Sequence, residues 1–356
     1  MIFKEDAVVL RSTCWMLLAI CTMAPAADVT FGTATALPGK RANGFLAVPG
    51  GADAATNLPV IVIHGARNGP VLSLICGAHG TEYASILAMQ KLSRSVDPAE
   101  LSGTVVILPL LNQASFAQMV PHLNPVDGKS MNRLYPGKAS GTQTERIAWI
   151  VTKEVLERSD YVMDFHGGDL DENLRRYSYW ADTGQSQVDA TARGMVLAFG
   201  LDHIIIQRNR TPAANGAVTV SRQAQTMGKP TIVVEAGHAG TTAAEDIDVL
   251  VQGSMNVMRH LHMLPGEAPF VERPIWIANA TVVPSERDGF FHPLVVPEAF
   301  VQKGMKIGYA TDGFGETIAE FRAPVSGVVI YIRAVPSLKK GDSVVDIGEI
   351  VEDPGK

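Results

Sequence analysis

The chain has 356 residues, of which 46% are hydrophobic and 19% are charged, and its formal net charge is −6. This length and composition predict a globular protein with a sizeable core and two domains, and they exclude a disordered chain. Both signs of charge are mixed along the sequence, so no basic block predicts a nucleic-acid partner.

Residues 1–26 have the pattern of a secretory signal peptide. Lys4 and Arg11 precede an apolar run over residues 14–23, and a small-residue step, Ala-Pro-Ala, ends at residue 26. The apolar run is too short to span a bilayer, so we expect a cleaved signal, no membrane span and a periplasmic location. The alternative is that this segment is a buried helix of the mature fold.

Residues 27–57 predict an extended N-terminal segment, and residues 58–265 predict a catalytic domain in which apolar runs alternate with helical patterns. Strands are expected at 59–63, 71–75, 104–108, 161–165, 203–206 and 230–234, and helices at 85–95, 144–158, 185–199, 214–227 and 242–263. This alternation predicts an α/β fold whose mixed, mostly parallel sheet has helices on both faces. The segment 112–140 lacks periodicity, and long loops of this kind are usually functional.

The pattern changes near residue 265. From residue 270 to 356, short apolar runs are separated by glycine and proline, which predicts a small C-terminal all-β domain. The segments 323–329 and 338–342 resemble the barrel-sandwich fold of biotinyl and lipoyl carrier domains, but they lack a carrier lysine in a tight turn between them. The resemblance therefore implies a barrel-sandwich-like shape with no attached cofactor.

Polar side chains follow three of the predicted strands at the point where each strand ends. They are His79 with Glu82, then His166, then Glu235. Open α/β sheets bind ligands at the carboxyl ends of their strands, so these side chains converge if the strands are neighbours. Two histidines and one carboxylate form the ligand set of a catalytic zinc that keeps one position open for water. A further carboxylate is needed to move the proton, and Glu235 is placed to do so.

Four motifs surround these residues. They are Gly-Ala-His-Gly-Thr-Glu at 77–82, Asn-Arg at 132–133 followed by Tyr-Pro-Gly at 135–137, Asp-Phe-His-Gly at 164–167, and Val-Glu-Ala-Gly at 234–237. Together they resemble the succinylglutamate desuccinylase/aspartoacylase family, which shares the zinc carboxypeptidase fold and hydrolyses the N-acyl amide bond of a small amino acid. The resemblance implies one zinc ion per chain on His79, Glu82 and His166. It makes Glu235 the proton shuttle.

The same resemblance implies the substrate contacts. Asn132 and Arg133 match a pair that grips the substrate carboxylate, and a guanidinium fork binds a carboxylate through two hydrogen bonds. The alternative for Arg133 is that it holds its own loop through backbone carbonyls. Where the family often has an arginine that stabilises the oxyanion, this chain has His122, which could serve only if it is protonated or donates an N–H. We therefore expect a less cationic pocket that suits a less acidic acyl group.

Two further clusters each have two interpretations. Asp169, Asp171 and Glu172 form an acidic loop after the second histidine, where solvated charge is the default and contact with a cationic substrate amine is the alternative. Tyr177 and Tyr179 follow two arginines, and they either line the mouth of a pocket or pack along an edge strand.

The leading prediction is a zinc-dependent amidohydrolase that deacylates an N-acyl amino acid with a carboxylate, or a related small amide. The alternative enzyme is a zinc metallocarboxypeptidase that acts on peptides such as cell-wall stem peptides with the same residues. A C-terminal β domain that caps the site would decide against an open peptide groove. A non-catalytic binding module is the third hypothesis, and the complete ligand set and Glu235 argue against it.

Overall fold

The computed structural model describes Met1, residues 27–210 and residues 218–355. The predicted signal peptide, apart from Met1, lies outside the described residues, so the exported location stays a prediction. Within the described ranges, no helix has the length and apolar character needed to cross a membrane.

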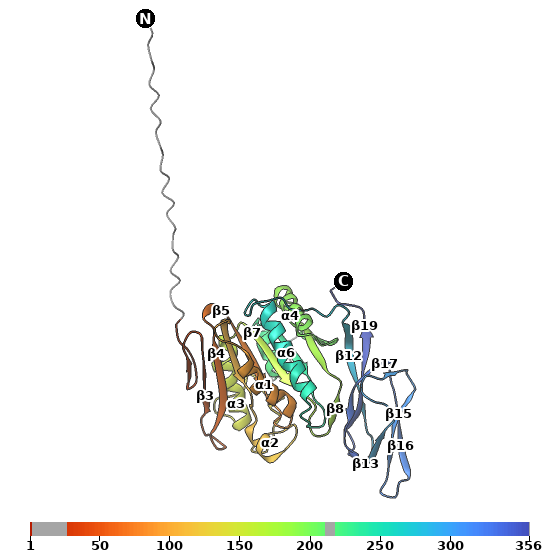
Figure 1. The fold of residues 1–356 in the computed structure, drawn as a ribbon. Coiled ribbons are helices and arrows are strands. Elements are labelled where there is room, and N and C mark those ends of the chain that lie inside the picture. The colour runs from red at the N-terminus through yellow and green to blue at the C-terminus, as the bar shows by residue number, and fades with distance from the viewer. Residues whose placement is uncertain (2–26, 211–217, 356) are drawn as a thin grey trace.

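One large mixed sheet runs through the molecule (Figure 1). From one edge to the other its strands are β14 (Phe300–Val301), β17 (Gly327–Arg333), β19 (Ser343–Val351), β12 (Ile275–Pro284), β10 (His203–Arg208), β9 (Tyr177–Asp182), β11 (Thr231–Glu235), β7 (Tyr161–His166), β5 (Arg67–Cys76), β6 (Ser102–Leu108), β4 (Thr56–His64) and β3 (Lys40–Val48), with β8 (Glu172–Leu174) paired to β17. Between β6 and β12 each pair of neighbouring strands is parallel, except that β9 and β11 are antiparallel to each other. The pairs outside that stretch are antiparallel. The predicted mixed α/β class is confirmed. The expectation of a mostly parallel sheet is wrong for the sheet as a whole, because five of its pairings are parallel and seven are antiparallel, and the parallel pairings are confined to its middle.

Helices cover both faces of this sheet. On one face lie α1 (Tyr83–Ser95), α4 (Ser186–Phe199) and α6 (Ala244–His260), and on the other lie α3 (Gln143–Glu154) and α5 (Val220–Thr226). Successive residues of a strand point to opposite faces, so Leu74 of β5 joins the first core and Ile75 joins the second. Each face therefore has its own buried core, which holds the strand ends in fixed positions.

Three shorter helices lie in the connections. They are α2 (Gln113–Gln118) and the single turns η1 (Met131–Arg133) and η2 (Leu156–Arg158). The long segment 112–140 thus contains two short helices, and α5 begins only at Val220, later than the helix expected from residue 214. Residues 211–217 lie outside the described ranges.

The N-terminal segment contains strands that the sequence did not predict. β1 (Val29–Phe31) and β2 (Ala34–Ala36) form a small hairpin, and β3 pairs along its whole length with β4 at the edge of the large sheet. Most of β3 is exposed or half-buried, with an apolar pattern only near its end. Because an edge strand buries so little, its sequence carries a weak apolar signal.

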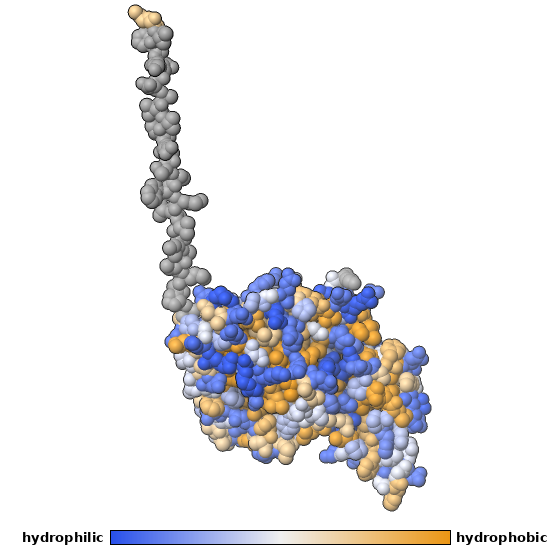
Figure 2. Space-filling view, viewed as in Figure 1, coloured by the Kyte–Doolittle hydropathy of each residue, from blue (hydrophilic) through white to orange (hydrophobic). Residues whose placement is uncertain are grey.

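Strands are the regular elements of residues 275–351. Besides the strands of the large sheet, a second sheet contains β13 (Gly289–Pro293), β15 (Lys306–Thr311), β16 (Thr317–Arg322) and β18 (Ser337–Leu338), and a third core lies between the two sheets. β12 pairs with both β10 and β19, so the large sheet continues across the boundary expected near residue 265. Figure 2 shows hydrophilic and hydrophobic side chains interspersed over one face of the molecule. A closed barrel and a separate domain here stay predictions.

Candidate active site

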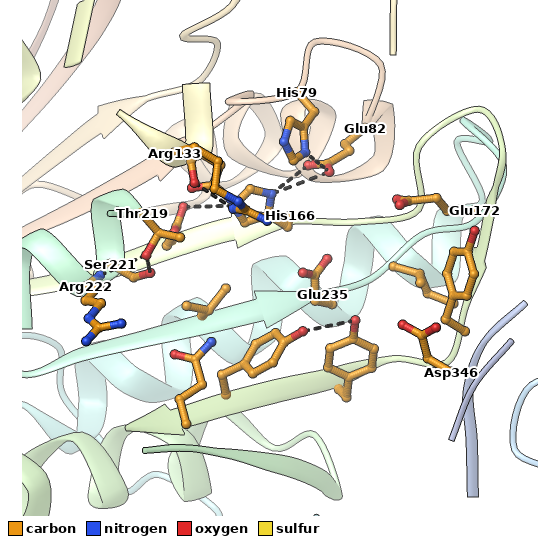
Figure 3. Close-up of a pocket in the computed structure, with 18 of the residues that line it drawn as sticks. His79, Glu82, Arg133, His166, Glu172, Thr219, Ser221, Arg222, Glu235 and Asp346 are labelled. Atoms are coloured by element: carbon orange, nitrogen blue, oxygen red, sulfur yellow. Dashed lines mark hydrogen bonds and ion pairs between the residues drawn. The ribbon is translucent and has the colours of Figure 1, made fainter. Parts of the chain in front are cut away.

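The carboxyl ends of three central strands meet because β7 pairs with both β5 and β11. His79 and Glu82 lie in the loop between β5 and α1, His166 ends β7, and Glu235 ends β11. Glu235 and His166 are also opposite each other in the strand register. The structure therefore brings together the four side chains that the strand ends pointed to (Figure 3).

Three of these side chains are arranged as a donor set for a metal ion. The Nδ1 atom of His79 lies 2.6 Å from Oε1 of Glu82, and Nδ1 of His166 lies 3.1 Å from Oε2 of Glu82. One donor atom from each residue lies within 4.8 Å of the other two. Burial opposes the charge on Glu82, but the two imidazoles outweigh it and lower the pKa of this carboxyl to about 2. Two imidazole nitrogens and a carboxylate fit zinc, so these residues could hold it.

Two glycines allow the loop between β5 and α1 to turn sharply. Gly77 has a φ of +70°, which a residue with a Cβ rarely adopts. Gly80 packs so closely that a Cβ there would collide with the backbone of Phe116 and Asn112, and its N–H donates to the hydroxyl of Ser115 at 2.9 Å. The loop is thereby fixed against the segment that carries α2.

Two polar side chains contact His166 at its Nε2 atom, on the side of the ring away from Glu82. Asp164 Oδ1 lies 3.3 Å from its Nε2 atom, and Asn132 Nδ2 lies 3.2 Å from the same atom. Asp164 is almost fully buried, and within the described part of the chain its oxygens have no partner apart from this ion-pair contact. Contacts to the distal nitrogen fix the ring orientation of a metal-binding histidine, here with Nδ1 toward Glu82.

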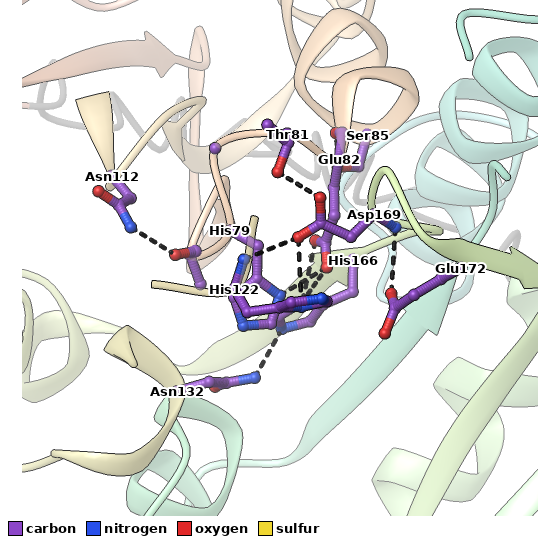
Figure 4. A network of polar contacts seen from close by, with 12 residues as sticks. His79, Thr81, Glu82, Ser85, Asn112, His122, Asn132, His166, Asp169 and Glu172 are labelled. Carbon is purple, nitrogen blue, oxygen red and sulfur yellow. Dashed lines mark hydrogen bonds and ion pairs between the residues drawn. The ribbon is translucent and has the colours of Figure 1, made fainter. Parts of the chain in front are cut away.

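A second polar network surrounds His122 (Figure 4). The buried carboxylate of Asp169 accepts hydrogen bonds from the hydroxyl of Thr81 and, at 2.9 Å, from the backbone N–H of His122. The ring of His122 lies 2.8 Å from Asp171, and this hydrogen bond raises the pKa of His122 to about 9 against the effect of burial. The imidazole is therefore protonated at neutral pH. Both of its nitrogens face carboxylates, so the expected contact with substrate stays a prediction.

A cavity of about 600 Å³ opens beside the metal-ligand set, which is an ordinary size for a small-molecule site. In Figure 3, Arg133 and Arg222 lie on one side of it, Glu172 and Asp346 lie on the other, and Glu235 lies between them. The cavity thus has a cationic end and an anionic end.

The structure also adds residues that sequence reasoning missed. Tyr331, Ser343 and Asp346 line the cavity from β17 and β19. The sequence did not indicate these residues as part of the site, because it predicted that residues 270–356 form a separate β domain. Tyr177 and Tyr179 line the cavity too, and their strand lies inside the sheet between β10 and β11, which selects the pocket interpretation over the edge strand.

Arg133 lies in a loop that is fixed beside α5. Tyr135 and Val218 exchange two backbone hydrogen bonds of 3.0 Å, which hold this loop against the start of the helix. Arg133 is exposed, lines the cavity and donates from Nη1 to the carbonyl of Asn132 at 2.6 Å. It therefore makes the loop contact of the alternative interpretation and still faces the cavity.

Comparison with known proteins places this architecture. The model of the succinylglutamate desuccinylase/aspartoacylase catalytic domain matches residues 68–261. The N-alpha-acetyl-L-2,4-diaminobutyric acid deacetylase of Halomonas elongata is 29% identical over 323 residues, which cover 88% of this chain and 93% of the relative.

Two solved structures have a similar fold. The product-bound Ectoine utilization protein EutE (DoeB) from Ruegeria pomeroyi superposes with a TM-score of 0.79 at 25% identity, covering 86% of this chain and 95% of that one. A succinylglutamate desuccinylase/aspartoacylase from Rhodobacter sphaeroides has a TM-score of 0.79 at 23% identity, covering 92% and 99%, and shows the fold alone.

The mixed sheet, the His-Glu-His set and these relatives define a hydrolase that acts on amide bonds. The family model covers more than half of the sequence. The chain belongs to the succinylglutamate desuccinylase/aspartoacylase family, as its motifs predicted.

Proposed function

We propose that this chain is a zinc-dependent deacylase that hydrolyses the amide bond of an N-acyl amino acid. The observation that carries the proposal is the convergence of His79, Glu82 and His166 with Glu235 in the lining of one cavity of about 600 Å³. The Halomonas elongata relative is named for removing an acetyl group from the α-nitrogen of an amino acid, which supports the same bond class here.

The roles of the side chains follow from their chemistry. His79, Glu82 and His166 would hold the zinc, which when bound activates a water molecule and polarises the amide carbonyl. Glu235 accepts a proton from the attacking water and passes it to the nitrogen of the leaving amine. Burial raises the pKa of Glu235 well above its usual value, which makes its carboxylate a stronger base than an exposed one.

A small acylated amino acid fits the cavity better than an extended peptide. Side chains from β17 and β19 close one side of the cavity, so the C-terminal strands narrow the space that a peptide groove would need. We infer that the substrate enters as a single amino acid unit with its acyl group, and that its carboxylate lies toward Arg133 and Asn132.

A panel of N-acetyl and N-succinyl amino acids beside short peptides tests this function. The zinc-loaded protein is expected to release free amino acid from at least one N-acyl amino acid faster than it removes the last residue of any peptide. Appearance of free amine, measured before and after treatment with a chelator, gives the rates. Faster removal of C-terminal residues from peptides with free amino termini would establish the metallocarboxypeptidase instead.

Replacing Arg133 with Lys is expected to raise KM by roughly tenfold with a smaller change in kcat, because lysine cannot form the two parallel hydrogen bonds to a carboxylate. Steady-state kinetics with an N-acyl amino acid and with its carboxamide measure the effect. The increase in KM should disappear for the carboxamide, and Arg94→Lys on α1 serves as the control because Arg94 does not line the cavity. An equal change with both substrates would assign Arg133 to its loop alone.

A further inference from the structure

We propose that Asp346, together with Glu172 from the same cavity lining, selects substrates by binding an ammonium group on the side chain of the N-acyl amino acid. This inference rests on the proposed function, because it concerns the same cavity. The relative from Halomonas elongata is named for an N-acylated diamino acid, and the selection of that class is assigned here to a residue of β19.

The strand register places the two carboxylates on one surface. Tyr331 of β17 is opposite Leu174 of β8 on one side and opposite Asp346 of β19 on the other. Directly opposed residues in a sheet share a face, and so do residues two apart in a strand, which brings Glu172 onto that face with Leu174. All four side chains line the cavity, so this face of the three strands forms its anionic wall.

Each carboxylate has one oxygen fixed by the protein and one oxygen open to a ligand. The hydroxyl of Ser343 donates to Oδ1 of Asp346 at 2.6 Å, and the backbone N–H of Asp169 donates to Oε2 of Glu172 at 3.1 Å. Among the described residues, no side chain or backbone group bonds the other oxygen of either carboxylate. The side chains are thus oriented without being neutralised.

The cation that the strand register places opposite Glu172 already forms ion pairs with other carboxylates. Arg333 is the register partner of Glu172, but its guanidinium lies 3.4 Å from Asp171 and 3.1 Å from Asp342. Burial raises the pKa of Glu172 to about 7, with the charge of Glu82 as a second cause, and burial also raises the pKa of Asp346. Ionisation of both carboxyl groups is therefore disfavoured by poor solvation, and a bound cation would favour their charged forms.

The other residues of the wall favour an organic cation. Three tyrosine rings, those of Tyr177, Tyr179 and Tyr331, line the cavity together with the two carboxylates. Aromatic faces attract ammonium groups, and carboxylates accept their hydrogen bonds. At the other end of the cavity Arg133 is available for a carboxylate, so the charges match those of a diamino acid acylated on its α-nitrogen.

Matched substrate pairs test the selection. N-α-acetyl-L-diamino acids with the ammonium on one to four methylenes are compared with N-acetyl amino acids in which a methyl group replaces the ammonium. In the zinc-loaded protein, kcat/KM for at least one cationic member should exceed that of its neutral isostere by about tenfold or more, and Asp346→Asn should remove most of this ratio. Glu172→Gln should lower it as well. The ratio is independent of the fraction of active protein, so a partly unfolded variant does not distort it.

Glu349→Gln is the matched control, because it removes a carboxylate from the same strand outside the cavity lining, and it should leave the ratio unchanged. Equal rates for cationic and neutral members, or an unchanged ratio in Asp346→Asn, would overturn the proposal. Calorimetry of the binding of the same substrate pairs tests the selection by Asp346 separately from the proposed deacylase function. Binding that needs the ammonium and Asp346, without turnover, would uphold the selection and refute the deacylase; neither binding nor turnover would refute both.

Discussion

Glu235→Gln is expected to lower kcat by about 10²- to 10⁴-fold, the usual contribution of a general acid–base group, while the protein keeps one zinc ion per chain. The amide has nearly the same shape as the carboxyl group, but it cannot accept the proton of the attacking water or return it to the leaving amine. Release of free amine gives kcat, and elemental analysis of the purified variant gives the zinc content.

Glu154→Gln on α3 is the control for this substitution, since Glu154 is exposed and does not line the cavity. Loss of zinc together with activity in Glu235→Gln would make Glu235 a ligand instead of a proton carrier. Activity near that of the unchanged protein would remove it from the mechanism altogether. The two outcomes differ in the metal content, so the assay distinguishes them.

His79→Ala is expected to abolish stoichiometric zinc binding and to reduce turnover by at least about 10³-fold, because a bound zinc ion would lower the pKa of its water towards neutrality. His79 is one of three donors within 4.8 Å of one another, and it is the most exposed of them, so the fold should tolerate its truncation. Zinc content and amine release measure the two effects.

The unchanged protein provides the comparison. Chelation should inactivate it, and an equivalent of zinc should restore it, whereas His79→Ala should stay inactive under the same treatment. His260→Ala is the matched histidine control, because His260 ends α6 and lines no part of the cavity. Hydrolysis that survives complete removal of metal would refute the metal-dependent mechanism, whatever the variant shows.

Much of the catalytic part could be predicted from the sequence, because its signals are local. β7 and β11 are apolar runs that end in a polar residue, and the apolar end of β5 leads directly into the loop that carries His79. The two histidines and Glu235 meet only because these strands are neighbours. Strand order is not encoded locally, so the motif resemblance was needed to join the three ends. The edge strand β3 was missed because half of it faces solvent.

The anionic wall could not be predicted for a different reason. Asp346 and Glu172 share a face only through the pairing of β8, β17 and β19, which joins segments more than 150 residues apart in the sequence. No local pattern reports such a register. The acidic loop did suggest a cationic amine as one alternative, but its main partner, Asp346, lies in a region whose sequence predicted only a β domain.

Attachment of β19 to the rest of the sheet also decides how the cavity is completed. This strand spans Ser343–Val351, pairs with β12 and β17, and supplies both Ser343 and Asp346 to the cavity. The metal-ligand set lies at the ends of other strands of the same sheet, together with the loop that carries His79 and Glu82. A substitution that weakens the pairing of β19 with β12 would therefore change the shape of the cavity without touching any of the proposed metal ligands.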